Sequence, residues 1–303
     1  MQKLQLDIIK KLIEKNATSA EIDFLLYVSK FQNSYGEAEG IYYREVCDEL
    51  GFSYQTFYDV KNSLIKKGII SAVKRNYTDY DITILNNVFV NEDDFKKGYL
   101  NTNYDVFSCS QFRSLKAGAK LLAMDLMKNN LAGGKSYHIG TNKFFDTYKK
   151  AYCFCERTLR DYLKMLRLIF SIGIKDKQYW VTLRVFAKKK QNKSEEQRYR
   201  DNTIAVATRR NKLKNIREED RTALDSMLSR YGSEIKKLNG TFVKFSFANV
   251  VEKSLEKLNV GNEKRHTWKR MVKPNLIHRI LRRELGLEVR ELPFDSSELF
   301  TMA

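Results

Sequence analysis

The feature that most constrains the fold is the order of helical and strand patterns between residues 18 and 85. Thr18-Ser-Ala-Glu21 is a capping-box pattern, and it opens a run whose apolar residues have helical spacing. A polar loop is expected over 33–40, followed by a short helix over 43–50 that ends at Gly51, where a left-handed cap residue belongs. Ser53 then caps a third helix, which is predicted to end at Gly68.

A hairpin is predicted after the third helix. Residues 69–75 and 80–85 have strand character on either side of Asn76-Tyr-Thr-Asp79. The order is then helix, helix, turn, helix, hairpin. With the Gly51-Phe-Ser53 turn and the Lys66-Lys-Gly-Ile-Ile70 exit into a strand, this stretch resembles bacterial winged-helix DNA-binding domains. The resemblance implies a third helix in the major groove and a hairpin against the DNA backbone or minor groove.

The same order of patterns returns further along the chain. Helices are predicted over 112–129, 142–150 and 155–170, and strands over 172–175 and 179–186. A shift of 102 residues places Thr56-Phe-Tyr-Asp59 on Thr158-Leu-Arg-Asp161 and Leu64 on Leu166. The shared order favours an internal duplication.

We therefore predict a mainly α fold with small β-hairpins, made of two tandem winged helix-turn-helix domains and a C-terminal helical domain. The predicted boundaries are 1–88 for the first domain, 89–110 for a connection, 111–187 for the second domain and 188–303 for the helical domain. In the last part, helices are expected over 194–215, 218–238, 245–258 and 263–285.

The charge balance indicates a polyanionic partner. The chain has 55 Lys and Arg against 37 Asp and Glu, a formal net charge of +18, and residues 188–303 hold 27 of these cations against 16 acids. No apolar run approaches the ~18 residues of a membrane span, and the first residues lack a signal-peptide core, so a bacterial cytoplasmic protein without membrane contact is expected. The four cysteines are expected to be thiols.

The candidate DNA-contacting residues are those left exposed when the apolar faces are buried. Amides and arginines pair with base edges, whereas lysines and tyrosine hydroxyls suit phosphate. Two alternatives to DNA contact stay open. Any soluble helix exposes a charged face, and Tyr58 could pack on a neighbouring helix. The candidates are Tyr54, Gln55, Tyr58, Lys61 and Asn62 on the first reading helix; Glu156, Arg157, Arg160 and Lys164 on the second; Lys74, Arg75, Asn76, Lys175, Lys177 and Gln178 on the hairpins; and Arg265, Lys269 and Arg270 in the tail.

The sequence contains no complete motif of an enzyme active site. Gly134-Lys135-Ser136 is similar to the end of a phosphate-binding loop, but Asn129 stands where the first glycine is required. Only three histidines occur, with no metal-binding spacing among them, and Cys153-x-Cys155 has no second close pair. We expect no catalytic activity, no cofactor and no metal.

The expected function is sequence-specific binding of double-stranded DNA. Two such heads without a catalytic site resemble the replication initiators of bacterial plasmids and some phages, which implies binding at an origin and recruitment of host replication machinery. A transcriptional regulator with the same heads, acting with host transcription machinery, is the alternative. An accessory protein in plasmid segregation or conjugation, and a protein-interaction scaffold, remain open, as does a homodimer.

Overall fold

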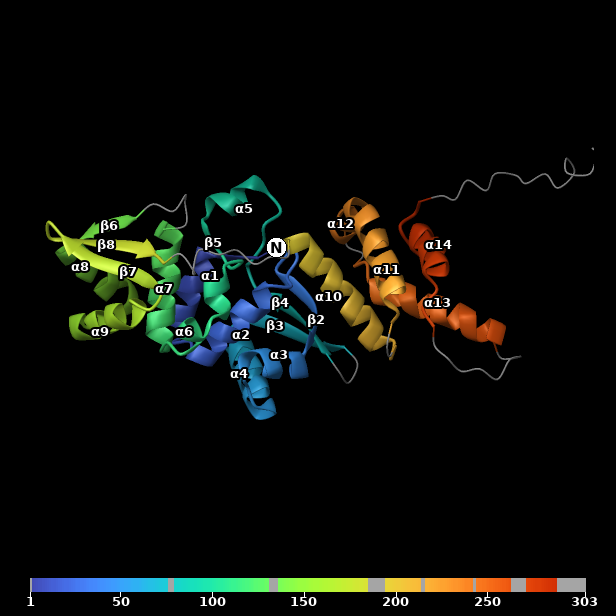
Figure 1. Cartoon of the computed structure of the whole chain (residues 1–303), viewed down its shortest axis with the longest axis horizontal. Coiled ribbons are helices and arrows are strands. Elements are labelled where there is room, and N and C mark those ends of the chain that lie inside the picture. Colours follow the sequence, from blue (N-terminus) through green and yellow to red (C-terminus); the bar gives the residue numbers. More distant parts are fainter. Residues whose placement is uncertain are drawn as a thin grey trace, which may run out of the picture. The chain divides into compact units, whose positions relative to one another are not determined.

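The structure is a computed structural model of the chain, and it describes residues 2–75, 79–130, 136–184, 194–213, 216–241, 244–262 and 271–287. Over these residues the fold is mainly helical with small antiparallel sheets, in line with the prediction; it has fourteen α-helices and three sheets (Figure 1). The chain divides into two compact units, Met1–Tyr199 and Arg200–Ala303, each with its own apolar core. The domain boundaries proposed from the sequence stay predictions.

Residues 18–85 form the first module. It consists of α2 (Ser19–Ser29), β2 (Glu37–Tyr42), α3 (Tyr43–Leu50), α4 (Tyr54–Lys66), β3 (Ile70–Arg75) and β4 (Asp79–Ile84). The capping box at α2 is confirmed, because the Thr18 hydroxyl accepts the Glu21 N–H while the Glu21 carboxylate accepts the Thr18 N–H. The helix predicted over 43–50 is confirmed as well. The sheet has the order β2-β4-β3, with the hairpin strands in register from Ile70 opposite Ile84 to Arg75 opposite Asp79.

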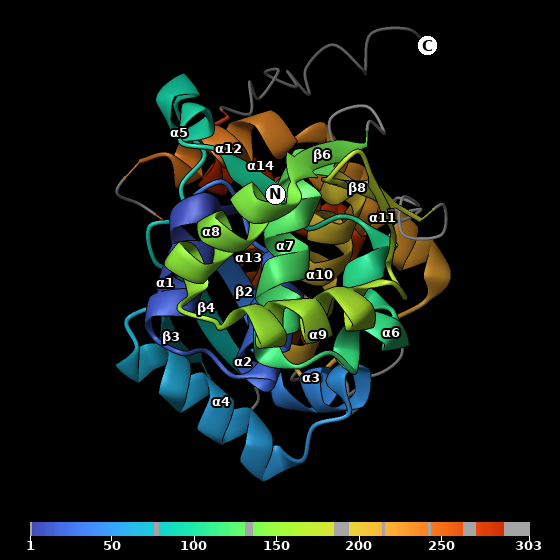
Figure 2. The same ribbon diagram turned by 90° about the vertical axis from the view of Figure 1, so that its left-hand side faces the viewer.

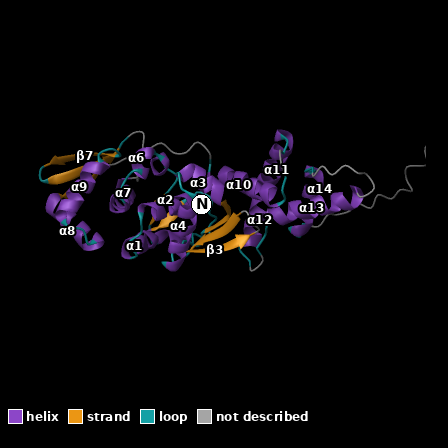
Figure 3. Cartoon of the chain, turned by 90° about the horizontal axis from the view of Figure 1, so that it is seen from below, coloured by secondary structure: helices purple, strands orange, loops and turns teal. Residues whose placement is uncertain are grey.

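Residues 117–184 form the second module, which repeats the first. It consists of α7 (Ala117–Asn130), β6 (Tyr137–Gly140), α8 (Thr141–Tyr152), α9 (Glu156–Leu166), β7 (Phe170–Lys175) and β8 (Gln178–Leu183). Its sheet has the order β6-β8-β7, and β7 has the same alternation of buried and exposed residues as β3. The labels β3 and β7 in Figure 3 mark these two separate sheets.

Several sequence predictions need correction. The loop predicted over 33–40 ends in strand β2, and β6 was not predicted at all, because short strands containing glycine carry no alternating pattern. The single helix predicted over 112–129 is broken into α6 (Ser110–Arg113) and α7. Leu115 lies between the two helices, and its carbonyl accepts a hydrogen bond from the Ser19 hydroxyl. The helix predicted over 155–170 ends at Leu166, and β7 begins at Phe170.

The N-terminal residues and the predicted connection pair with each other. Strand β1 (Lys3–Gln5) is antiparallel to β5 (Tyr99–Asn101), and α1 (Leu6–Glu14) follows β1 directly. The buried Asn87 side chain holds β1 in place by accepting the Gln5 N–H at 2.8 Å and donating to the Lys3 carbonyl at 3.0 Å. The rest of this segment contains α5 (Glu92–Lys96) and a 3-10 turn at Asp105–Ser108.

One core joins the two modules, because α2 packs on α7 at its centre. Lys120 of α7 is fully buried, and its ammonium lies 2.6 Å from both carboxylate oxygens of Asp23 on α2. Gly118 permits close packing of α9 on α7, since a β-carbon at this position would lie 2.7 Å from the Tyr162 ring. The two modules are therefore parts of one folded unit.

The second unit is helical in the residues described. Its helices are α10 (Glu195–Arg210, from Arg200 onward), α11 (Glu218–Arg230), α12 (Gly232–Asn239), α13 (Phe247–Asn262) and α14 (Pro274–Glu284). The helix predicted over 218–238 is split at Tyr231, whose ring is buried in the core of this unit. Pro274 opens α14 at the first turn, where a missing N–H costs nothing.

Candidate nucleic-acid interface

A tight turn sets the direction of α4. Gly51 ends α3 in the left-handed conformation, with φ of 68°, and Ser53 accepts the Thr56 N–H at 3.0 Å to cap α4. Phe57 and Leu64 then face the core. The opposite face of α4 is therefore available to a partner.

The structure places most α4 candidates at the surface. Tyr54 is 57% exposed and Tyr58 37% exposed, and Gln55 and Asn62 are exposed as well. The Gln55 amide donates to Asp59 one turn later at 2.7 Å, so DNA binding through this amide would have to replace that bond.

The prediction that Lys61 faces outward is wrong. Only 8% of Lys61 is exposed, and its ammonium lies 4.6 Å from the centroid of the Tyr80 ring and 2.9 Å from the Asn62 side-chain oxygen. Burial, with a smaller contribution from nearby Lys74, lowers the pKa of Lys61. Lys61 is thus a structural cation that packs against aromatic rings.

Tyr43 of α3, which the sequence analysis did not single out, joins the candidates Tyr54 and Tyr58 in an aromatic cluster. The centroid of the Tyr43 ring lies 5.3 Å from that of Tyr54, 6.5 Å from that of Tyr58 and 5.1 Å from that of Tyr42. The exposed Arg44 donates to the Tyr43 hydroxyl at 3.2 Å. Phenol hydroxyls and a guanidinium at one surface suit phosphate oxygens.

The first hairpin carries a partly neutralised charge. Lys74 is exposed, whereas the exposed Arg75 donates to the Asp81 carboxylate of the neighbouring strand at 2.9 Å. Asn76 lies outside the described residues.

In the second module, the exposed face of α9 is cationic. Arg157, Arg160 and Lys164 are all exposed. Arg160 is held along the helix by Glu156 at 2.6 Å, and hydrogen bonds from Arg160 and Lys149 lower the pKa of Glu156. Within the part of the chain that the structure describes, Arg157 has no ionic partner. Arg157 is therefore the α9 cation most accessible to an external anion.

The second hairpin exposes cations and an aromatic ring. Asp176 and Lys177 both have positive φ, as a two-residue turn of the mirror-image type requires, and Lys175, Lys177 and Gln178 are exposed. On the outer face, the Trp180 ring contacts the His138 ring, with 3.6 Å between ring centroids and the two planes tilted by 37°. This pair was also missed, since β6 had not been predicted.

The two modules differ strongly in charge although they share a fold. Residues 117–184 contain thirteen Lys and Arg against five Asp and Glu, whereas residues 18–85 contain seven against ten. The second module is therefore the one suited to a polyanion.

Figure 1 shows α4 at the bottom of the first unit, and Figure 2 shows α9 in front of α7 and above α4. The predicted tail residues Arg265, Lys269 and Arg270 lie outside the described residues. Across the described ranges, no helix is both long and apolar enough to cross a membrane. Comparison of the chain with protein-family models, with curated proteins and with solved structures finds no match.

Proposed function

We propose that the two modules are winged-helix heads and that the chain binds double-stranded DNA in a sequence-specific manner. The observation that carries this proposal is the repeated exposure of one helix. In each module the helix that precedes the hairpin, α4 or α9, buries its apolar face and presents polar or cationic side chains outward. A helix in this position enters the major groove in winged-helix proteins.

Two heads that contact adjacent half-sites about one helical turn apart would protect ~20 base pairs. Because the modules share one core, their spacing would be set by the fold rather than by a linker.

The charge difference supports a division of work between the heads. The second head would supply most of the phosphate contacts, through Lys164, Lys175 and Lys177. Arg157 would read guanine through its two-pronged guanidinium. The first head, which has an excess of acidic residues, would recognise DNA mainly through Tyr54, Gln55 and Asn62.

For the biological role we propose a plasmid or phage replication initiator, on the strength of the resemblance of tandem heads without a catalytic site. Selection of bound fragments from random DNA gives the recognised sequence, and its position in the parent replicon separates the roles. Clustered matches at an origin support an initiator. Matches only at promoters mean a transcriptional regulator.

Substitutions test the interface itself. Arg157→Ala is expected to cost ~1–3 kcal/mol of binding free energy at one base pair, while Arg157→Lys keeps the charge but loses the two-pronged contact. Lys175→Ala is expected to weaken binding to all sequences and to lower the salt slope by about one. The matched control is Lys96→Ala, an exposed cation on α5 outside the proposed interface.

Gel-shift or fluorescence titration at several salt concentrations measures these effects. If Arg157→Ala and Lys175→Ala both bind like Lys96→Ala, the assigned surface is wrong. A footprint of about 10 base pairs would mean that only one head contacts DNA.

A further inference from the structure

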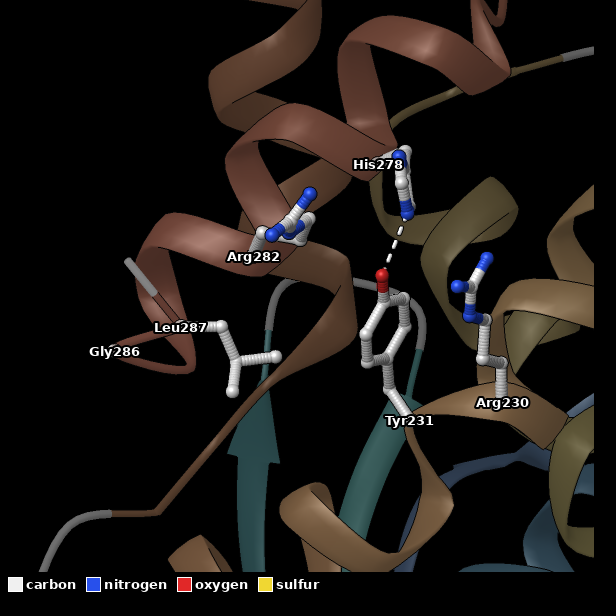
Figure 4. Close-up of a pocket in the computed structure, with 6 residues that line it drawn as sticks. All are labelled: Arg230, Tyr231, His278, Arg282, Gly286 and Leu287. Atoms are coloured by element: carbon white, nitrogen blue, oxygen red, sulfur yellow. Dashed lines mark hydrogen bonds between the residues drawn. The ribbon is translucent and has the colours of Figure 1, made fainter. Parts of the chain in front are cut away.

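The second unit contains a cleft between α11 and α14 (Figure 4). Its volume is about 590 Å³, which is within the range of small-ligand sites. The residues that line it are Arg230, Tyr231, His278, Arg282, Gly286 and Leu287.

Polar groups converge in this cleft. The Tyr231 hydroxyl and the Nε2 atom of His278 are 2.6 Å apart, and the Arg230 guanidinium lies 5.8 Å from the centroid of the Tyr231 ring. Figure 4 shows the Tyr231 ring with Arg230 on one side and Arg282 on the other, and its hydroxyl directed toward His278.

Among the residues that the structure describes, the cleft is lined by two arginines and by no acid. Neither Arg230 nor Arg282 has a carboxylate partner within the described ranges, whereas Lys253 of α13 is paired with Glu284 of α14 at 2.8 Å. Burial, together with the like charges of Arg282 and Arg230, lowers the pKa of His278. An anion bound here would relieve the repulsion among these groups.

We propose that this cleft binds a phosphate group, supplied by a free nucleotide or by a nucleic-acid backbone. A guanidinium is the side-chain group that pairs best with phosphate oxygens, and the cleft has one on each side of the Tyr231 ring. The proposal goes beyond DNA binding by the two modules and does not depend on it.

The Tyr231–His278 pair would couple phosphate binding to a proton. When His278 is neutral, the Tyr231 hydroxyl can donate its only hydrogen to Nε2. When His278 is protonated, Nε2–H donates to the Tyr231 oxygen, and the tyrosine hydrogen becomes free for the phosphate. The groups that face His278 are Arg282 on its own helix and Arg230 and Tyr231 from α11 and the turn after it; Lys253 of α13 is already paired with Glu284.

Histidine NMR of the full chain tests the proposal, because the chain has only three histidines and His278→Gln identifies the signal. The first probe is inorganic sulfate, whose charge stays constant between pH 6 and pH 8. Saturating sulfate is expected to raise the pKa of His278 by about one unit, as an opposite charge within a few ångströms does. By linkage, sulfate affinity then increases by up to about tenfold as the pH falls through the two pKa values.

Variants assign the effect to the cleft. Arg282→Gln is expected to weaken sulfate binding by about tenfold or more, and Arg282→Lys to restore part of the affinity. The control is Arg279→Gln, an exposed arginine on the same helix that does not line the cleft. Equal losses in Arg279→Gln and Arg282→Gln would overturn the proposal, because they would indicate only a general charge effect.

Two further probes identify the source of the phosphate. A shift of the His278 signal with adenosine monophosphate supports a nucleotide site, and a shift with duplex DNA supports a backbone site. If none of sulfate, mononucleotide and duplex moves the signal, the proposal is overturned.

Discussion

The buried ion pair between Lys120 and Asp23 gives the sharpest stability prediction. Lys120 has no exposed surface, Asp23 is 11% exposed, and the ammonium lies 2.6 Å from both carboxylate oxygens. Lys120→Met removes the charge that compensates a largely desolvated carboxylate. We expect a loss of ~3–5 kcal/mol in the free energy of unfolding, the usual cost of breaking a buried pair. The positive charge of Arg113 also favours the ionised form of Asp23, although burial raises its pKa overall. Arg113 would therefore still compensate part of the Asp23 charge in Lys120→Met, and we expect a loss toward the lower end of this range.

The double variant Asp23→Leu/Lys120→Met separates loss of compensation from loss of packing. Burial raises the pKa of Asp23 and lowers that of Lys120, so desolvation costs both charges. Replacing both with apolar groups is therefore expected to leave stability within about 1 kcal/mol of wild type, or to increase it. In Lys120→Met alone, the deficit should shrink as the pH falls through the raised pKa of Asp23, because the protonated acid needs no partner.

Urea unfolding measures these changes. The chain has two tryptophans, and a Trp268→Phe background leaves Trp180 as the fluorescent probe of the first unit. A loss below about 1 kcal/mol for Lys120→Met would refute the reasoning, as would a double variant as unstable as the single one.

Two further predictions concern single positions. Burial alone would raise the pKa of Glu21, but the Lys67 ammonium, 2.6 Å from the carboxylate, keeps that pKa below its ordinary value. Glu21→Gln is therefore expected to lower the free energy of unfolding by ~1–2 kcal/mol at pH 7. The contribution of Glu21 to stability is present above the ordinary glutamate pKa of about 4.3 and is lost as the pH falls through the lower pKa of the folded state. The unfolding free energies of wild type and Glu21→Gln, measured with urea, should therefore converge at low pH. A difference that stays constant with pH would contradict the role assigned to Glu21. Gly51 and Cys153 occupy equivalent left-handed positions, with φ of 68° and 54°. Gly51→Ala is expected to destabilise by ~1 kcal/mol and Cys153→Gly to stabilise by a similar amount, and changes of the same sign in thermal unfolding would contradict this.

Local signals account for the parts of the fold that the sequence predicted well. The capping box at Thr18, the left-handed Gly51 and the apolar spacing of Phe57, Val60 and Leu64 each act within a few residues, so they can be recognised without knowledge of the partner. Strands β1, β2, β5 and β6 were missed because their formation depends on pairing with distant residues.

The same distinction between local signals and long-range pairing explains which residues of the candidate interface could be placed from the sequence. Exposure of Tyr54 and Arg157 follows from helical periodicity, which the sequence displays. Lys61 was misplaced although it stands four residues after Phe57, on the buried face, and the 102-residue shift aligns it with the buried Leu163. The repeated sequence pattern therefore already indicated that Lys61 occupies a core position. The contact between His138 and Trp180 could not be inferred, because it requires the register of β6.

The outer faces of the two hairpins, β3-β4 and β7-β8, differ in a way that bears on the roles proposed for the two heads. Val73 lies opposite Asp81 in the first hairpin, and Arg75 is bound to that carboxylate, so the first hairpin neutralises one of its two cations. At the matching register in the second hairpin, Gly173 lies opposite Trp180, and no carboxylate takes the place of Asp81. Lys175 at the end of this strand stays exposed, with its ammonium 6.0 Å from the Trp180 ring. Of the two hairpins, one thus binds its arginine to a carboxylate of its own sheet, and the other leaves Lys175 without a carboxylate partner among the described residues. This difference fits the proposed assignment of base recognition to the first head and phosphate attachment to the second, because counterion release depends on cations that have no internal partner.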